Sequence, residues 1–149
     1  MQEIQDLKNL RDDLADKPTT AEALKASAVG DLRFLCSRVG YGLLNNVDYL
    51  ALHDSNSKKL ADILVFGYEK GGVKISFPER LLNTDGKMYA GVVLYDNNVV
   101  KDAYLFEGAL FQKPGMFSIF KRKGGTCYVD VSNETKLKEY SFGNVIQKI

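Results

Sequence analysis

The sequence MYAGVVLY, residues 88–95, decides the fold class. Every residue in it is apolar, aromatic or glycine, so a strand made from it would be apolar on both of its alternating faces. Such a strand is typical of the interior of a sheet that is covered on both sides, because both faces must be removed from water. We therefore expect residues 88–95 to form a central strand, with the rest of the chain arranged around it.

Two turn signals predict antiparallel hairpins in the C-terminal half. The sequence Asp-Asn-Asn at residues 96–98 tolerates left-handed backbone conformations and can reverse the chain into a strand at residues 99–106. Gly124-Gly125 can do the same between predicted strands at residues 116–121 and 126–132. These strands are expected to pair as neighbours.

The last two predicted strands differ in their patterns. In residues 126–132, apolar Cys127, Val129 and Val131 alternate with polar residues, so one face is expected to be buried and the other solvated. Residues 137–149 contain several large apolar side chains and predict a final strand that is interrupted at Gly143.

The middle of the chain gives weaker signals. By the period of their apolar positions, residues 47–52 and 60–68 each fit either a strand or a helix. The turn sequence Lys-Gly-Gly at residues 70–72 and the alternating segment at 73–77 favour a hairpin in which residues 60–68 supply the first strand.

The N-terminal third is predicted to be helical. Residues 2–16 form an amphipathic pattern whose apolar stripe consists of Ile4, Leu7, Leu10 and Leu14. A capping-box pattern at residues 19–22 begins a second helix that runs to Gly30. Asp31 is expected to cap a third, short helix that Gly40 ends.

The apolar stripe of the first helix needs a partner, because an isolated helix of this length is marginal in water. It can dock on the β-region of its own chain, or it can associate with copies of itself as a short coiled coil. The sequence leaves both alternatives open.

Length and composition predict one α+β domain over residues 1–149. A helical segment at residues 1–40 is expected to pack on a mostly antiparallel sheet or small barrel at residues 62–149. Cys36 and Cys127 match no metal-binding spacing and are expected to be buried free thiols. No signal peptide or membrane span is visible in the sequence, which predicts a cytoplasmic location, or more broadly an intracellular or virion one.

The sequence contains no recognisable catalytic set. Gly40-Tyr41-Gly42 begins like a dinucleotide-binding loop, but it follows a helix and is better explained as a helix stop and turn. His53 is the only histidine and lies in a polar segment beside Asp54, where we expect it to be solvated. We therefore expect no enzymatic activity, small-molecule substrate, metal or cofactor.

One local group of charges points to a different function. Lys121, Arg122 and Lys123 lie at the predicted hairpin tip, with Phe120 and Tyr128 on the same pair of strands. Basic side chains among aromatic rings are typical of proteins that bind single-stranded nucleic acid, where bases stack on the rings. The net charge of +1 gives no long-range attraction for a polyanion, and a solvated turn that protects a strand edge explains the same residues.

The sequence from Tyr89 to Phe111 resembles the short β-rich domains of virus-particle decoration proteins. The first expectation for function is a non-enzymatic structural or protein-interaction subunit of a homo-oligomer or larger assembly, such as a virus particle. The apolar stripe of the first helix is its predicted protein contact. Single-stranded nucleic-acid binding through the basic hairpin tip is the alternative.

Overall fold

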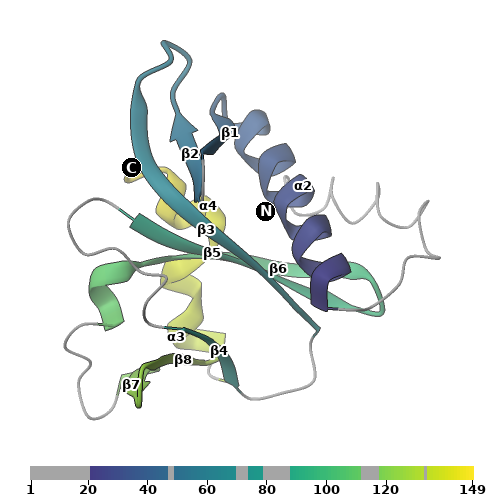
Figure 1. Ribbon diagram of the computed structural model, residues 1–149, viewed down its shortest axis with the longest axis vertical. Helices are drawn as coiled ribbons and strands as arrows, with labels where there is room; N and C mark the ends of the chain where they lie inside the picture. The colour runs from purple at the N-terminus through teal and green to yellow at the C-terminus, as the bar shows by residue number, and fades with distance from the viewer. Residues whose placement is uncertain (1–20, 47–48, 70–73, 79–87, 112–117, 133) are drawn as a thin grey trace.

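The structure is a computed structural model that describes residues 21–46, 49–69, 74–78, 88–111, 118–132 and 134–149. It begins with the helix α2, Ala21–Arg38, and continues mainly as strands in two sheets (Figure 1). The five-stranded sheet has the order β1 (Gly42–Asn46), β2 (Tyr49–His53), β3 (Lys59–Glu69), β5 (Met88–Asp96) and β6 (Val99–Glu107). The three-stranded sheet has the order β4 (Lys74–Pro78), β8 (Thr126–Asp130) and β7 (Phe120–Lys123).

Short helical elements complete the described chain. They are η2 (Gly108–Phe111), α3 (Glu134–Leu137), η3 (Lys138–Tyr140) and α4 (Phe142–Ile146). Among the described strands, every pair is antiparallel except β3 with β5, which is parallel. The α+β class and the mostly antiparallel pairing are confirmed, while the described strands form two open sheets and no closed barrel.

The strand predicted to be central, β5, lies between β3 and β6 and is buried along residues 88–95. Its odd-numbered residues Tyr89, Val93 and Tyr95 belong to a core that also contains side chains of α2 and α4. Its even-numbered residues Ala90, Val92 and Leu94 belong to a second core, formed with the three-stranded sheet and α3. The prediction of a strand covered on both faces is therefore confirmed. Both faces of β5 are apolar because each one packs in a different core.

Both predicted hairpins are present. β5 and β6 pair through a turn in which Asn97 and Asn98 have positive φ angles of 50° and 67°. β7 and β8 pair through Gly124 and Gly125, at φ angles of 59° and 79°. The alternation predicted for residues 126–132 is confirmed over β8, because Cys127 and Val129 are buried in the second core and their neighbours are partly exposed. The strand ends at Asp130, and residues 131–132 form a turn in which Val131 is partly buried.

The prediction of a break at Gly30 and Asp31 is wrong, because α2 continues through both residues. Asp31 lies inside the helix at 6% exposure, and its carboxylate accepts a hydrogen bond of 2.5 Å from the Tyr95 hydroxyl. Burial of Ala28 and Leu32 on either side of Gly30 continues the apolar face, and this packing outweighs the weak helix propensity of one glycine.

The end of α2 occurs as the sequence predicts. The amide of Tyr41 donates a hydrogen bond to the carbonyl of Cys36 at 2.9 Å, and the amide of Gly40 donates one to the carbonyl of Ser37 at 3.2 Å. Gly40 has a φ of 86°. These two bonds form a Schellman motif, which confirms the helix stop at Gly40 and its turn.

Two predictions about strands are wrong. Residues 60–68 and 73–77 do not form a hairpin: β3 pairs with β2 and β5, whereas β4 pairs with β8 in the other sheet. Residues 137–149 do not form a strand, because α3, η3 and α4 occupy most of this segment. Phe142 and Ile146 are four residues apart and both enter the first core, which favours a helical turn over a strand.

Cys36 and Cys127 are free and buried, as the sequence predicts. Burial raises the pKa of the Cys36 thiol to about 12, because the thiolate would lose its hydration inside the first core. The thiol therefore stays protonated at neutral pH and acts as a small apolar side chain.

Candidate functional site

The basic hairpin tip is formed by β7 and β8. Lys121, Arg122 and Lys123 are exposed, and Lys121 lies directly opposite Tyr128 in the strand register. Tyr128 is partly exposed, so one cation and one aromatic ring share the outer face of this sheet.

Phe120 does not belong to that outer face. It is 3% exposed and packs in the second core, where its ring lies 4.9 Å from that of Tyr140 and 5.2 Å from that of Phe111. Its ring is therefore not available to stack on a base. The register pairs Phe120 with buried Val129, so the alternation in β8 carried the signal for its orientation.

The predicted protein contact of the first helix lies outside the described residues. Ile4, Leu7, Leu10 and Leu14 all belong to residues 1–20. The predicted contact through this stripe remains a prediction.

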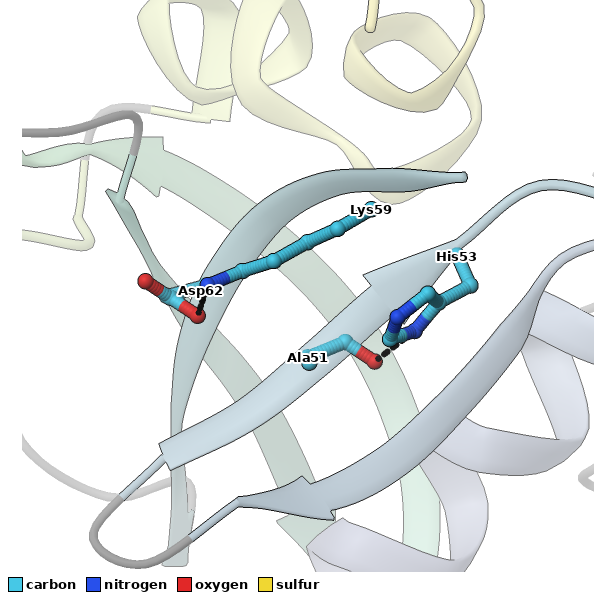
Figure 2. A network of polar contacts seen from close by, with 4 residues as sticks. All are labelled: Ala51, His53, Lys59 and Asp62. Atoms are coloured by element: carbon cyan, nitrogen blue, oxygen red, sulfur yellow. Dashed lines mark hydrogen bonds and ion pairs between the residues drawn. The ribbon is translucent and has the colours of Figure 1, made fainter. Parts of the chain in front are cut away.

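His53 is the last residue of β2 and is partly buried, rather than solvated in a loop (Figure 2). Its Nδ1 lies 3.2 Å from the carbonyl oxygen of Ala51, which accepts a hydrogen bond when Nδ1 carries a proton. A separate contact on β3 joins the ammonium of Lys59 to the Asp62 carboxylate at 2.8 Å. The Asp62 oxygen of this ion pair is buried and makes no further hydrogen bond within the described chain.

The carboxylate of Asp54, the residue after His53, accepts hydrogen bonds from the backbone of the turn that follows it. One oxygen of Asp54 accepts hydrogen bonds from the amides of Asn56 and Lys58, both at 2.9 Å. This geometry stabilises the loop between β2 and β3.

A surface between α2 and β1 exposes apolar side chains. Among the described residues, the exposed large hydrophobics are Val39, at 36%, and Leu44, at 57%. Both lie at this end of the molecule, after the last residue of α2 and on the edge strand β1. An open hollow of about 380 Å³ adjoins Leu44, and Arg33, Tyr41 and Leu43 contribute to its walls. We call Val39, Leu44 and this hollow the α2–β1 surface.

Arg33 joins the helix to the edge strand on this surface. Its Nε donates to the Leu43 carbonyl at 3.0 Å, and its guanidinium also donates to the Asn45 side chain at 3.1 Å. The first of these bonds occupies a main-chain acceptor of β1, and covering such a group protects a sheet edge.

A second hollow of about 370 Å³ lies where β5 begins and β6 ends, beside the C-terminal helices. Leu105, Leu110 and Val145 give it apolar walls. Its polar lining consists of Tyr89, Glu107, Glu139, Tyr140 and Lys148. We call this cavity the C-terminal hollow. Sequence reasoning missed it, because its lining comes from residues up to about 60 positions apart.

The two tyrosines of the C-terminal hollow stay neutral at physiological pH. Burial raises the pKa of Tyr89, and the negative charge of Glu107, opposite it in the register, raises it further. Burial and the charge of Glu139 raise the pKa of Tyr140 in the same way. Both phenols can therefore donate as well as accept hydrogen bonds.

In the part of the chain that the structure describes, no group of three or more His, Cys, Asp or Glu side chains is placed to hold a metal ion. The helices described here include none with the length and apolar character needed to cross a membrane. Comparison with family models, with curated proteins and with solved structures finds no match for this chain.

Proposed function

We propose that this chain is a non-enzymatic protein-interaction subunit that associates with copies of itself, alone or within a larger assembly. The observation that carries the proposal is the α2–β1 surface, where Leu44 leaves apolar area in water in the wall of an open hollow and Val39 is exposed just after the end of α2. Exposed apolar area of this kind is typical of protein contacts when several such side chains adjoin.

The predicted first helix has the chemistry to cover this surface. Its stripe of Ile4, Leu7, Leu10 and Leu14 is apolar, and acidic residues outnumber basic ones over residues 1–17. Arg33 and Arg38 are exposed on α2 next to the apolar side chains. Opposite charges around an apolar contact favour its formation and orient the partner. In the proposed oligomer, the stripe of one copy lies on the α2–β1 surface of another.

The contact is expected to use side chains rather than strand pairing. The bond from Arg33 to the Leu43 carbonyl would have to break before another strand could add to β1. A helix placed on Leu44 and Val39 leaves this bond intact, and it resembles the way an amphipathic helix lies in an apolar groove.

Multi-angle light scattering tests the proposal. We expect the unmodified chain to be oligomeric at micromolar concentration, and both Leu7→Asp/Leu10→Asp and Leu44→Asp to be monomeric, since each places a charge in the apolar contact. The matched control is Gln5→Asp/Asn9→Asp, which adds the same charges on the opposite side of the predicted helix and should stay oligomeric. A monomeric unmodified chain, or a control that dissociates equally, would contradict the proposal.

Nucleic-acid binding remains the alternative, supported by the pairing of Lys121 with Tyr128 on the open face of the three-stranded sheet. A fluorescent single-stranded oligonucleotide titrated over a salt series tests it. If the alternative holds, replacing Lys121, Arg122 and Lys123 with alanine lowers affinity at low salt and flattens the salt dependence, because phosphate contacts release counterions. Phe120 is not expected to contribute, since its ring is buried. Unchanged affinity in the triple variant would remove this alternative.

A further inference from the structure

We propose that the C-terminal hollow binds a small protonated amine that carries an apolar body. This inference goes beyond the proposed function and does not depend on it, because the hollow shares no lining residue with the α2–β1 surface. The most deeply buried polar residue in its wall is Tyr89.

Tyr89 is 5% exposed and packs in the first core, yet it also lines the hollow. Its hydroxyl forms no hydrogen bond with any residue that the structure describes. This oxygen is not among the buried side-chain atoms that lack a partner, so it has accessible surface on the side of the hollow. A ligand in the hollow can therefore exchange a hydrogen bond with the Tyr89 hydroxyl in place of water.

The charges around the hollow indicate the sign of that group. Glu107 and Glu139 both line it, against one ammonium, that of Lys148. Within the described chain, neither carboxylate has a hydrogen bond or an ion pair. An ammonium group can donate to a carboxylate and to the Tyr89 oxygen at once, and bonds that involve charged groups are the stronger ones. An anion would instead meet two negative charges at close range.

The other residues that line the hollow are mainly apolar, which indicates that the rest of the ligand is apolar too. Leu105, Leu110 and Val145 present aliphatic surface, and Tyr140 adds an aromatic ring. An aromatic face attracts a nearby cation. The volume of about 370 Å³ is at the lower end of the range for small-molecule sites, which suits a ligand of about ten non-hydrogen atoms.

Phenethylamine is the probe that matches these features, and 2-phenylethanol and 3-phenylpropionate are its neutral and anionic counterparts. We would titrate each into the full-length, ¹⁵N-labelled chain and follow the amide signals by NMR. Phenethylamine is expected to bind with a dissociation constant of about 1 mM or below. The shifted signals should belong to the walls of the hollow, and the other two compounds should bind at least about tenfold more weakly.

Two variants test the assigned residues. Tyr89→Phe removes only the hydroxyl and keeps the ring in the core, and it is expected to weaken phenethylamine binding about fivefold. Glu107→Gln/Glu139→Gln removes both charges and should weaken it about tenfold or more. Asp96→Asn is the matched control, because this exposed carboxylate lies at the opposite end of β5 from Tyr89 and its loss should leave the affinity unchanged.

The proposal is overturned if phenethylamine shifts no signals of the hollow at millimolar concentration, or if 3-phenylpropionate binds as tightly as the amine. It is also overturned if Tyr89→Phe keeps the full affinity. If the double glutamine variant fails to give a dispersed spectrum, the three-compound series and Tyr89→Phe still decide the question. Failure here would leave the oligomer proposal standing, since that rests on light scattering of different variants.

Discussion

Phe106→Ala is expected to lower the free energy of unfolding by about 3–5 kcal/mol, the usual range for a large-to-small change at a fully buried aromatic residue. Phe106 is 0% exposed, and its ring packs in the second core against Phe120 at 5.5 Å and Tyr140 at 5.7 Å. Removing the ring takes away apolar contacts between β6, β7 and the C-terminal helical segment at once. It also leaves a cavity that this many-sided packing cannot collapse to fill.

Urea unfolding at one fixed protein concentration measures this loss, and the fixed concentration matters because self-association would add to the apparent stability. Phe106→Leu keeps part of the apolar volume and should lose clearly less than Phe106→Ala. A loss below about 1 kcal/mol for Phe106→Ala would show that the ring does not hold the two sheets together.

Gly67→Ala is expected to be the most damaging addition of a single methyl group. A Cβ at Gly67 would lie 2.4 Å from the carbonyl oxygen of Leu24 and 2.8 Å from its carbonyl carbon. Both atoms belong to the backbone of α2, so no side-chain rotation relieves the clash and the helix must move away from β3. Overpacking of this kind costs about 1–3 kcal/mol and sometimes more.

The matched control for this prediction is Gly30→Ala, the same substitution on α2. A Cβ at Gly30 meets nothing within 4 Å, and the residue is helical. Alanine there should stabilise the chain by about 0.5–1 kcal/mol, because glycine is a poor helix former. In urea unfolding, we expect Gly67→Ala to lower the free energy of unfolding and Gly30→Ala to raise it. Equal effects would mean that α2 does not pack closely on β3.

Some features of the fold follow from neighbours in the sequence, and these could be predicted. The hairpin after β5 depends on Asn97 and Asn98, which tolerate positive φ angles, and the hairpin after β7 depends on Gly124 and Gly125. The end of α2 depends on Gly40 in the same way. Each is a local backbone requirement that only a few residue types satisfy.

The pairing of β3 and β4 could not be read from the sequence. Lys70-Gly71-Gly72 looks like a hairpin turn, yet β4 pairs with β8, about 50 residues further along the chain. β3 instead takes β5 as its parallel neighbour, which makes β3 an interior strand. The choice of partner depends on which apolar faces close the two cores, and a turn signal carries no information about that.

The candidate sites also contain some features that the local sequence predicts and others that depend on contacts between distant residues. The exposure of Lys121, Arg122 and Lys123 was expected, but the inward ring of Phe120 was not. The alternation in β8 gave the information needed, once the register of β7 against it was known. The C-terminal hollow had no local signal, because Tyr89 looks like any core aromatic until Glu107 and Glu139 are placed around it.

By itself, the sequence determined the α+β class, both C-terminal hairpins, the end of α2 and a strand at residues 88–95 that is buried on both faces. These features rest on turn chemistry and apolar period, which act over a few residues. Only the tertiary structure decided that β4 joins a second sheet and that residues 134–146 are mostly helical. It also decided that the hydroxyl of Tyr89 and the carboxylates of Glu107 and Glu139 line the same open hollow. Those outcomes depend on contacts between distant residues, where burial in a shared core outweighs local preference.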